Sequence, residues 1–229
     1  EAFDGYVGAA AGKFTITFFG QPNAEISGAG TINFNTTGIV NKGTTASNST
    51  TIPPVLDVQR AYTVQGATAL GFVTTHTAGT IKLSGSYTFT NPVYNTAAYT
   101  IPANGAFWIN NANFTVAGLT GSPTVNGLLK LTAGTLNVGT ATGNAMGAAA
   151  TATFLFEGGT ANFTGRFQNA AACVFTLSGS TLNICTIGNA ATSSASFGLT
   201  STTATVTMSG GIINMVQASG GTTPLDWRV

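Results

Sequence analysis

One eight-residue pattern recurs along this chain, and its clearest copy is Leu177-Ser178-Gly179-Ser180-Thr181-Leu182-Asn183-Ile184. The pattern is an apolar residue, a small turn and then apolar-Asn-apolar, with the asparagine six positions after the first residue. We call it the repeat; three further copies begin at Leu131, Phe156 and Met208. Recurrence of one short unit indicates structural units that stack on one another.

Looser copies precede the regular ones, and the spacing between copies points to a fold. They are Ile26–Phe34, with one extra residue in its turn, Leu83–Phe89, and Phe107–Val116, in which Thr115 takes the place of the asparagine. From Thr115 onward, equivalent places are 22, 25, 21 and 31 residues apart. A period in the twenties, made of short strands, is typical of a β-solenoid whose coils stack about 4.8 Å apart.

We therefore predict an all-β fold, a right-handed parallel β-solenoid (β-helix) with an irregular N-terminal part. No segment shows a sustained helical period. An antiparallel β-sandwich is the alternative, because turn signals also recur about every 8–12 residues.

Alternation within the repeat predicts which side chains face inward. Leu182 and Ile184, with their equivalents in the other copies, would form a continuous apolar core, while the turn glycines permit the positive φ of sharp corners. Outward-facing threonines and asparagines would form a ladder of hydroxyls and amides on neighbouring strands: Thr135, Thr160 and Thr181 with Asn137, Asn162, Asn183 and Asn214. Either these amides hydrogen-bond each other and fix the register, or they form a flat polar array that binds sugar, mineral or ice.

The chain is expected to form one continuous domain with two parts. Residues 1–104 would be an N-terminal cap or irregular β region, with loops at 35–54 and 91–104, and residues 105–229 would hold the regular coils. The alternating run Lys13–Phe19 predicts a strand. Its apolar residues Phe14, Ile16 and Phe18 mark a segment that could pair with a neighbouring molecule by strand addition.

The scarcity of charge restricts the partners of this 229-residue chain. Charged residues make up 6% and the net charge is +1, whereas about 25% is usual. Seven scattered basic residues make no phosphate-binding face, so no nucleic acid is expected. No apolar run is long enough for a membrane-spanning helix. The abundance of Thr, Asn and Gly resembles exported proteins, which predicts an extracellular or cell-surface location.

The ionisable residues do not predict an active site. Acidic residues are Glu1, Asp4, Glu25, Asp57, Glu157 and Asp226. No two occupy equivalent places in adjacent repeats, whereas glycoside hydrolysis needs a carboxylate pair. Glu157 and Arg166 are expected to form a surface ion pair, with an enzyme using both as the alternative. His76 has no acidic neighbour and is interpreted as a surface strand residue. We expect no catalytic residue, no metal and no cofactor.

Aromatic residues and cysteines give two further expectations. Tyr94 and Tyr99 lie between prolines that would hold their loop away from the coils as a sugar-binding platform, whereas Trp108 is expected in the core or a cap. Cys173 and Cys185 flank one repeat, and alternation puts them on opposite faces. Two buried or half-buried free thiols are therefore expected, and a disulfide requires a bulged turn.

The repeat, in the form Leu-Ser-Gly-Ser-Thr-Leu-Asn-Ile, resembles the β-strand repeats of exported bacterial surface proteins such as adhesins and autotransporter-like passenger regions. The resemblance covers about residues 105–220 and transfers no catalytic residue. It implies an extracellular structural or adhesive module without catalytic activity. The alternatives are a self-assembling filament or sheath subunit, and a carbohydrate-binding or carbohydrate-active protein with glycan contacts at Tyr94, Tyr99, Asn137, Asn162 and Asn183. Expected partners are copies of itself, other surface proteins and glycans.

Overall fold

The computed structural model describes residues 79–169, 171–188, 195–216 and 227–229, together with positions 71, 73 and 76 and six earlier strands. These strands are β1 (Thr15–Phe18), β2 (Asn23–Ile26), β3 (Ile32–Phe34), β4 (Ile39–Lys42), β5 (Val55–Val58) and β6 (Tyr62–Val64). Of their side chains, only that of Val58 is described. Phe14 lies outside the described residues, as does most of the predicted loop 35–54.

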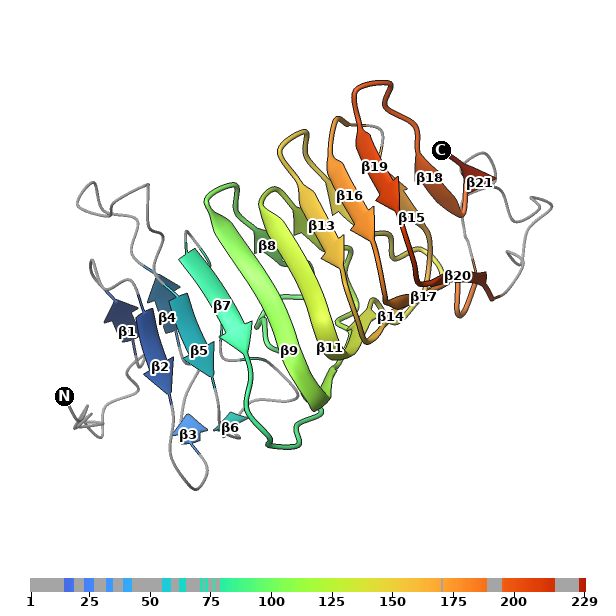
Figure 1. The fold of residues 1–229 in the computed structure, drawn as a ribbon. Coiled ribbons are helices and arrows are strands. Elements are labelled where there is room, and N and C mark those ends of the chain that lie inside the picture. The colour runs from blue at the N-terminus through green and yellow to red at the C-terminus, as the bar shows by residue number, and fades with distance from the viewer. Residues whose placement is uncertain are drawn as a thin grey trace.

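The described part of the chain contains strands and no helix, so the all-β prediction is confirmed. The principal row of strands runs side by side through the molecule from blue to red (Figure 1). After β2 and β5 it consists of β7 (Gly79–Leu83), β9 (Gly105–Val116), β11 (Leu128–Val138), β13 (Thr153–Phe156), β16 (Val174–Leu177) and β19 (Thr205–Met208).

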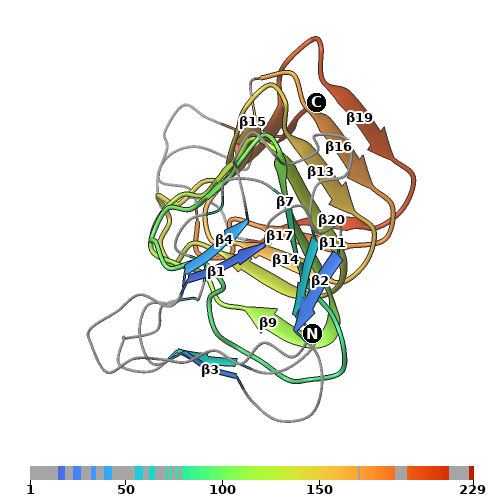
Figure 2. The ribbon, with the colours of Figure 1, turned by 90° about the vertical axis from the view of Figure 1, so that its left-hand side faces the viewer.

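Two further rows accompany the principal one. The second continues from the C-terminal halves of β9 and β11 into β14 (Thr160–Phe163), β17 (Thr181–Ile184) and β20 (Ile212–Met215). The third contains two groups of three strands, first β8 (Thr100–Ile101), β10 (Thr124–Val125) and β12 (Gly147–Ala148), then β15 (Phe167–Asn169), β18 (Phe197–Leu199) and β21 (Trp227–Arg228). Because one 11-stranded sheet joins the first two rows, the sheet curls around the interior that Figure 2 shows nearly end-on.

Every strand pair in the described part of the chain is parallel, and partners are about one repeat apart. Leu128 of β11 pairs with Thr153 of β13, and Thr160 of β14 with Thr181 of β17. Parallel neighbours cannot be joined by a hairpin, so the chain must cross over between them. The antiparallel β-sandwich is therefore wrong for this chain.

The inward and outward faces follow the alternation of the sequence. Leu136, Phe163 and Ile184 are buried in one common core, against which Met215 packs. Phenylalanines fill its centre, and the rings of Phe154 and Phe167 meet edge to face with centroids 5.1 Å apart. Burying each such side chain contributes about 1.5–3 kcal/mol, so this core is the main source of stability.

Two glycine positions in the turn of the repeat have different physical roles. Gly134, Gly159 and Gly211, which precede the second strand, have positive φ, a conformation that costs glycine little. The glycine one residue before Gly159 has no room for a side chain, because a Cβ on Gly158 would lie 2.3 Å from the carbonyl oxygen of Thr132 in the preceding repeat. At Gly158 the turns therefore stack closely enough that only glycine fits.

Three expectations about local structure are wrong. Strand β4 lies inside the predicted loop 35–54. Thr115 pairs with Thr135 instead of taking the asparagine place beside Asn137, because the register between β9 and β11 shifts twice in the turn. Cys185 does not face away from Ile184; both are buried, since Cys185 stands at a corner with φ of 57° that turns the chain.

Candidate functional site

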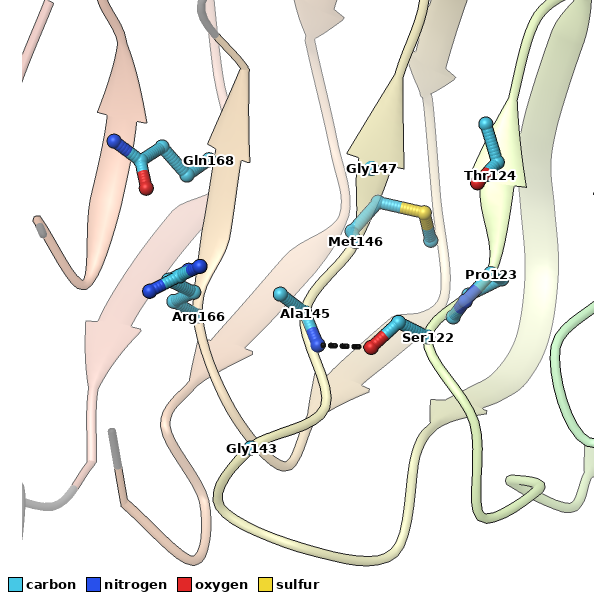
Figure 3. Close-up of a pocket in the computed structure, with 9 residues that line it drawn as sticks. All are labelled: Ser122, Pro123, Thr124, Gly143, Ala145, Met146, Gly147, Arg166 and Gln168. Carbon is cyan, nitrogen blue, oxygen red and sulfur yellow. Dashed lines mark hydrogen bonds between the residues drawn. The ribbon is translucent and has the colours of Figure 1, made fainter. Parts of the chain in front are cut away.

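An open groove of about 480 Å³ crosses three neighbouring segments of the third row (Figure 3). Thr124 of β10 pairs with Gly147 of β12, and the bridge between Met146 and Phe167 brings Gln168 of β15 beside Gly147. Side chains two residues apart on a strand share a face. Ser122 and Thr124 therefore form one wall, and Arg166 and Gln168 form the other.

The groove exists because the middle segment carries small residues. At Gly147 the nearest atoms to an added Cβ would be Pro123 O at 3.5 Å and Thr124 Oγ1 at 3.6 Å, so the absent side chain leaves room there for an atom in ordinary van der Waals contact. Ala145 adds only a methyl group, and its backbone N–H donates a 3.1 Å hydrogen bond to Ser122 Oγ. This bond ties the floor of the groove to the first wall.

Arg166 gives the groove its charge. Within the part of the chain that the structure describes, the half-buried guanidinium forms no hydrogen bond or ion pair. The predicted pair with Glu157 is wrong, because Glu157 lies 2.9 Å from Lys130 Nζ instead. Arg166 also affects Cys185: burial raises the pKa of this thiol, while a hydrogen bond from Ser196 and the positive charge of Arg166 lower it.

The chemistry that the groove offers is binding through hydrogen bonds and charge. A guanidinium presents a planar fork of donors that matches a carboxylate, and Gln168, Ser122 and Thr124 are of the types that bond hydroxyl groups. None of the nine lining residues is acidic. The lining therefore holds no carboxylate pair of the kind that glycoside hydrolysis uses.

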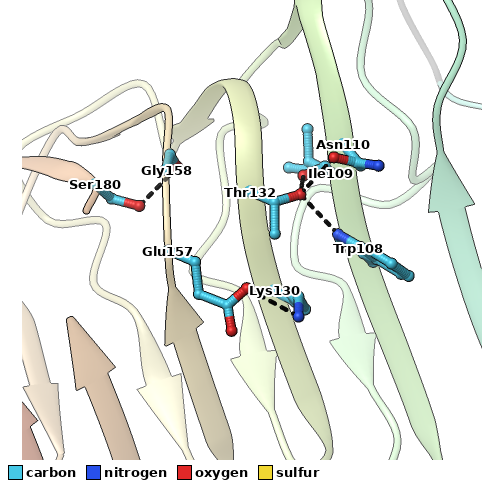
Figure 4. A network of polar contacts seen from close by, with 8 residues as sticks. All are labelled: Trp108, Ile109, Asn110, Lys130, Thr132, Glu157, Gly158 and Ser180. Carbon is cyan, nitrogen blue, oxygen red and sulfur yellow. Dashed lines mark hydrogen bonds and ion pairs between the residues drawn. The ribbon is translucent and has the colours of Figure 1, made fainter. Parts of the chain in front are cut away.

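A second group of polar contacts lies on the outer face of the principal row (Figure 4). Lys82 and Lys130 flank Trp108 in the register, with their Nζ atoms 4.7 and 5.0 Å from the ring centroid. The indole Nε1 donates a 2.9 Å hydrogen bond to Thr132 Oγ1. The expectation that Trp108 lies in the core or a cap is therefore wrong. Trp108 is half-buried on the outer face of the sheet, and its ring lies between two cationic side chains.

The acidic residues are also placed differently from the prediction. Glu25 of β2 pairs with Asp57 of β5, and Asp57 pairs with Lys82. Two acidic residues do then occupy equivalent places on adjacent strands, contrary to expectation. The long separation of Glu25 and Asp57 in the sequence, with β3 and β4 between them, had hidden this relation.

The structure places Tyr94 and Tyr99 in the core rather than on an exposed platform. Their rings stack with centroids 4.2 Å apart and an angle of 3° between their planes. They are 4% and 9% exposed, so no ring face is available to a sugar. Burial raises the pKa of both hydroxyl groups above the ordinary value of 10.

His76 is also not a surface residue. Its Nδ1 lies 3.0 Å from the hydroxyl of Tyr94 and its Nε2 lies 2.8 Å from the carbonyl oxygen of Gly79. The half-buried imidazole therefore joins the start of β7 to the tyrosine pair.

The asparagine ladder (Asn137, Asn162, Asn183 and Asn214) forms with one polarity throughout. The Nδ2 atoms of Asn162, Asn183 and Asn214 donate to the Oδ1 of the preceding ladder residue at 2.8, 2.7 and 2.8 Å. The interpretation that the amides bond each other across repeats is confirmed. A glycan contact at Asn137, Asn162 or Asn183 stays a prediction.

The remaining predicted residues lie in strands or in the core. Ile16 and Phe18 belong to β1, which pairs with β4 along one edge. Cys173 and Cys185 are both free and buried, so the predicted thiols are present and the disulfide alternative is wrong. In the described portion no three His, Cys, Asp or Glu residues gather as metal ligands, and no helix there has the length and apolar character to cross a membrane.

Sequence reasoning missed the groove. The available signal was Arg166, a basic residue directly before β15, with no acidic residue at the equivalent places of the neighbouring segments. The preceding segment carries the small residues Ala145 and Gly147 beside it. The unequal loops between repeats concealed this alignment. Comparison of the chain with protein-family models, with curated proteins and with solved structures gives no match.

Proposed function

We propose that this chain is an extracellular structural and adhesive surface module, a parallel β-solenoid without catalytic activity, whose groove at Arg166 binds a carboxylated saccharide. The solenoid is supported by parallel partners one repeat apart and by a single core that runs through all regular repeats. The low charge and the resemblance of the repeat to exported bacterial surface proteins support the location.

The observation that carries the adhesive function is the guanidinium of Arg166, which lies in an open groove and has no hydrogen-bond or ion-pair partner among the described residues. A ligand carboxylate can pair with this guanidinium through two parallel charge-assisted hydrogen bonds. The hydroxyl and amide groups around it suit the remaining hydroxyls of a sugar acid. A neutral sugar would leave the guanidinium unpaired, so the groove should discriminate in favour of uronic acids.

Titration calorimetry with oligomers of galacturonic acid tests this proposal. We expect the wild type to bind them and to bind neutral galactose oligomers of equal length at least 10-fold more weakly. Arg166→Gln should weaken binding about 10- to 100-fold, as expected for loss of a hydrogen-bonded charge pair. Gly147→Leu, which fills the groove, should weaken it as well.

Lys130→Gln is the matched control, because it removes one positive charge from another face of the molecule. Equal affinity of the wild type, Arg166→Gln and Gly147→Leu for the acidic oligomer would contradict the assignment of the groove. Equal weakening by Arg166→Gln and Lys130→Gln would show only general charge attraction, which also contradicts it.

A further inference from the structure

Among the described residues, no strand covers the C-terminal end of the three rows. Strands β19, β20 and β21 each pair on one side only among the described strands. Five of the exposed large apolar side chains gather there, with Met208 40% and Ile212 55% exposed; the others are Val216, Trp227 and Val229. Leu177, which precedes Met208 in the register, is 3% exposed. The last strands therefore present Met208 of a core column, Ile212 of the outward column that contains Thr181, and a free backbone edge to solvent.

The asparagine ladder is also incomplete at this end. Asn214 donates to Asn183, but no described group donates to Asn214 Oδ1. The acceptor Asn214 Oδ1 could therefore receive the same hydrogen bond from an asparagine on one further parallel strand.

Strand β2 lies at the opposite end of the principal row, and β3 carries the residue order of the repeat. The strand pairing of the principal row is continuous from β2 to β19. Followed from strand to strand, the register aligns Ala24 with Val206 and Ile26 with Met208. In β3, Asn33 stands between Ile32 and Phe34, the apolar-Asn-apolar order of the repeat. At this end, too, β1, β2 and β3 each pair on one side only among the described strands.

We propose that a second copy of this chain docks head to tail on the C-terminal end, with its β2 added to β19 and its β3 added to β20. Asn33 of the incoming copy is then placed at the register position that follows Asn214, and Ala24 and Ile26 are placed at the positions that follow Val206 and Met208. Strand addition supplies main-chain hydrogen bonds, and alternate side chains supply specificity. With a net charge of +1, little electrostatic repulsion opposes the contact.

This contact joins two different surfaces, so it does not close on itself and repeats along an axis. The product is a filament whose length depends on protein concentration. Neither Arg166 nor the groove takes part in this contact, so filament formation and saccharide binding can be tested independently.

Sedimentation velocity between about 1 and 200 μM tests the contact. The wild type should shift from monomer to a growing series of oligomers over this range. Ile212→Lys should raise the concentration required for association at least 10-fold, because it places a charge in the contact. Ile187→Lys is the matched control, since Ile187 is 46% exposed and follows β17 in the preceding coil instead of belonging to a terminal strand; it should associate like the wild type.

Two results overturn the proposal: a wild type that stays monomeric at 200 μM, and equal effects of Ile212→Lys and Ile187→Lys. Disulfide trapping fixes the orientation. In a mixture of Asn33→Cys and Asn214→Cys proteins, we expect mixed dimers to exceed either homodimer. Preferential Asn214→Cys homodimers would indicate a tail-to-tail contact and would also overturn it. Saccharide binding by Ile212→Lys should remain unchanged, which separates the two proposals.

Discussion

The side-chain amide of Asn183 donates a 2.7 Å hydrogen bond to Oδ1 of Asn162, which lies 21 residues earlier on the neighbouring strand. The same bond recurs on both sides of this pair. Each interior amide thus uses one donor and one acceptor on its neighbours. A strand shifted by one residue would lose these bonds and turn its apolar residues outward, so the ladder and the core select the same register.

Position in the ladder should determine the cost of losing an asparagine. Asn162→Ala removes two amide hydrogen bonds at a half-buried site, and we expect a loss of about 1–2 kcal/mol in the free energy of unfolding. Asn214→Ala removes one bond at the exposed end and should cost about 0.5 kcal/mol. Urea unfolding of both variants measures the difference. Equal losses would mean that the amides do not act as a connected ladder.

The close stacking of the turns gives a second prediction. Gly158→Ala places a methyl group 2.3 Å from the carbonyl oxygen of Thr132, so the backbone must move apart. We expect a loss of about 1–3 kcal/mol. The control is Gly143→Ala, where no atom lies within 4 Å of the added group and where stability should change by less than about 1 kcal/mol. Circular dichroism during thermal unfolding compares them; similar melting temperatures would contradict the stacking of the turns.

The regular repeats were predictable because two independent signals agree in them. Alternation separates Leu182 from Asn183, and the recurring apolar-Asn-apolar order identifies the equivalent residues of successive repeats. These signals depend on short-range order alone. They predicted the faces of β11, β14 and β17 and the bonds between their asparagines.

Prediction failed where the chain leaves that regular order. The register shifts between β9 and β11 moved Thr115 by two places relative to the expected alignment, and the positive φ of Cys185 reversed the direction of its side chain. Tyr94 and Tyr99 were misplaced because prolines indicate a loop but not whether its aromatic rings turn inward. The groove at Arg166 depends on the stacking of unequal loops, which sequence spacing does not encode.

The assignment of the two faces predicts the effect of a charge on β17. Leu182 is fully buried, so Leu182→Asp would bury an unpaired carboxylate, and we expect at least about 4 kcal/mol of destabilisation or failure to fold. Thr176 is an outward residue of the adjacent β16, and Thr176→Asp should cost less than about 1 kcal/mol. Chemical unfolding or, for an unfolded variant, far-UV circular dichroism distinguishes them. A Leu182→Asp protein as stable as Thr176→Asp would contradict the inward direction of Leu182.

The tyrosine pair predicts how stability changes at alkaline pH. Burial raises the pKa of Tyr94 and Tyr99 above the ordinary value of 10, so both hydroxyls keep their protons in the folded state when the unfolded chain has lost them. The unfolded state then binds fewer protons, and the free energy of unfolding falls as pH rises above 10. Each tyrosine contributes a slope of up to about 1.4 kcal/mol per pH unit.

Tyr99→Phe isolates this contribution, because it removes one titrating hydroxyl and leaves the other ionisable groups in place. The variant should match the wild type within about 1 kcal/mol at pH 7 and lose stability less steeply between pH 10 and 11.5. Urea unfolding at several pH values measures both slopes, while absorbance at 295 nm follows tyrosinate formation. In the folded wild type, Tyr94 and Tyr99 should ionise only as the protein unfolds. Parallel stability curves for the two proteins would contradict the burial of the Tyr99 hydroxyl.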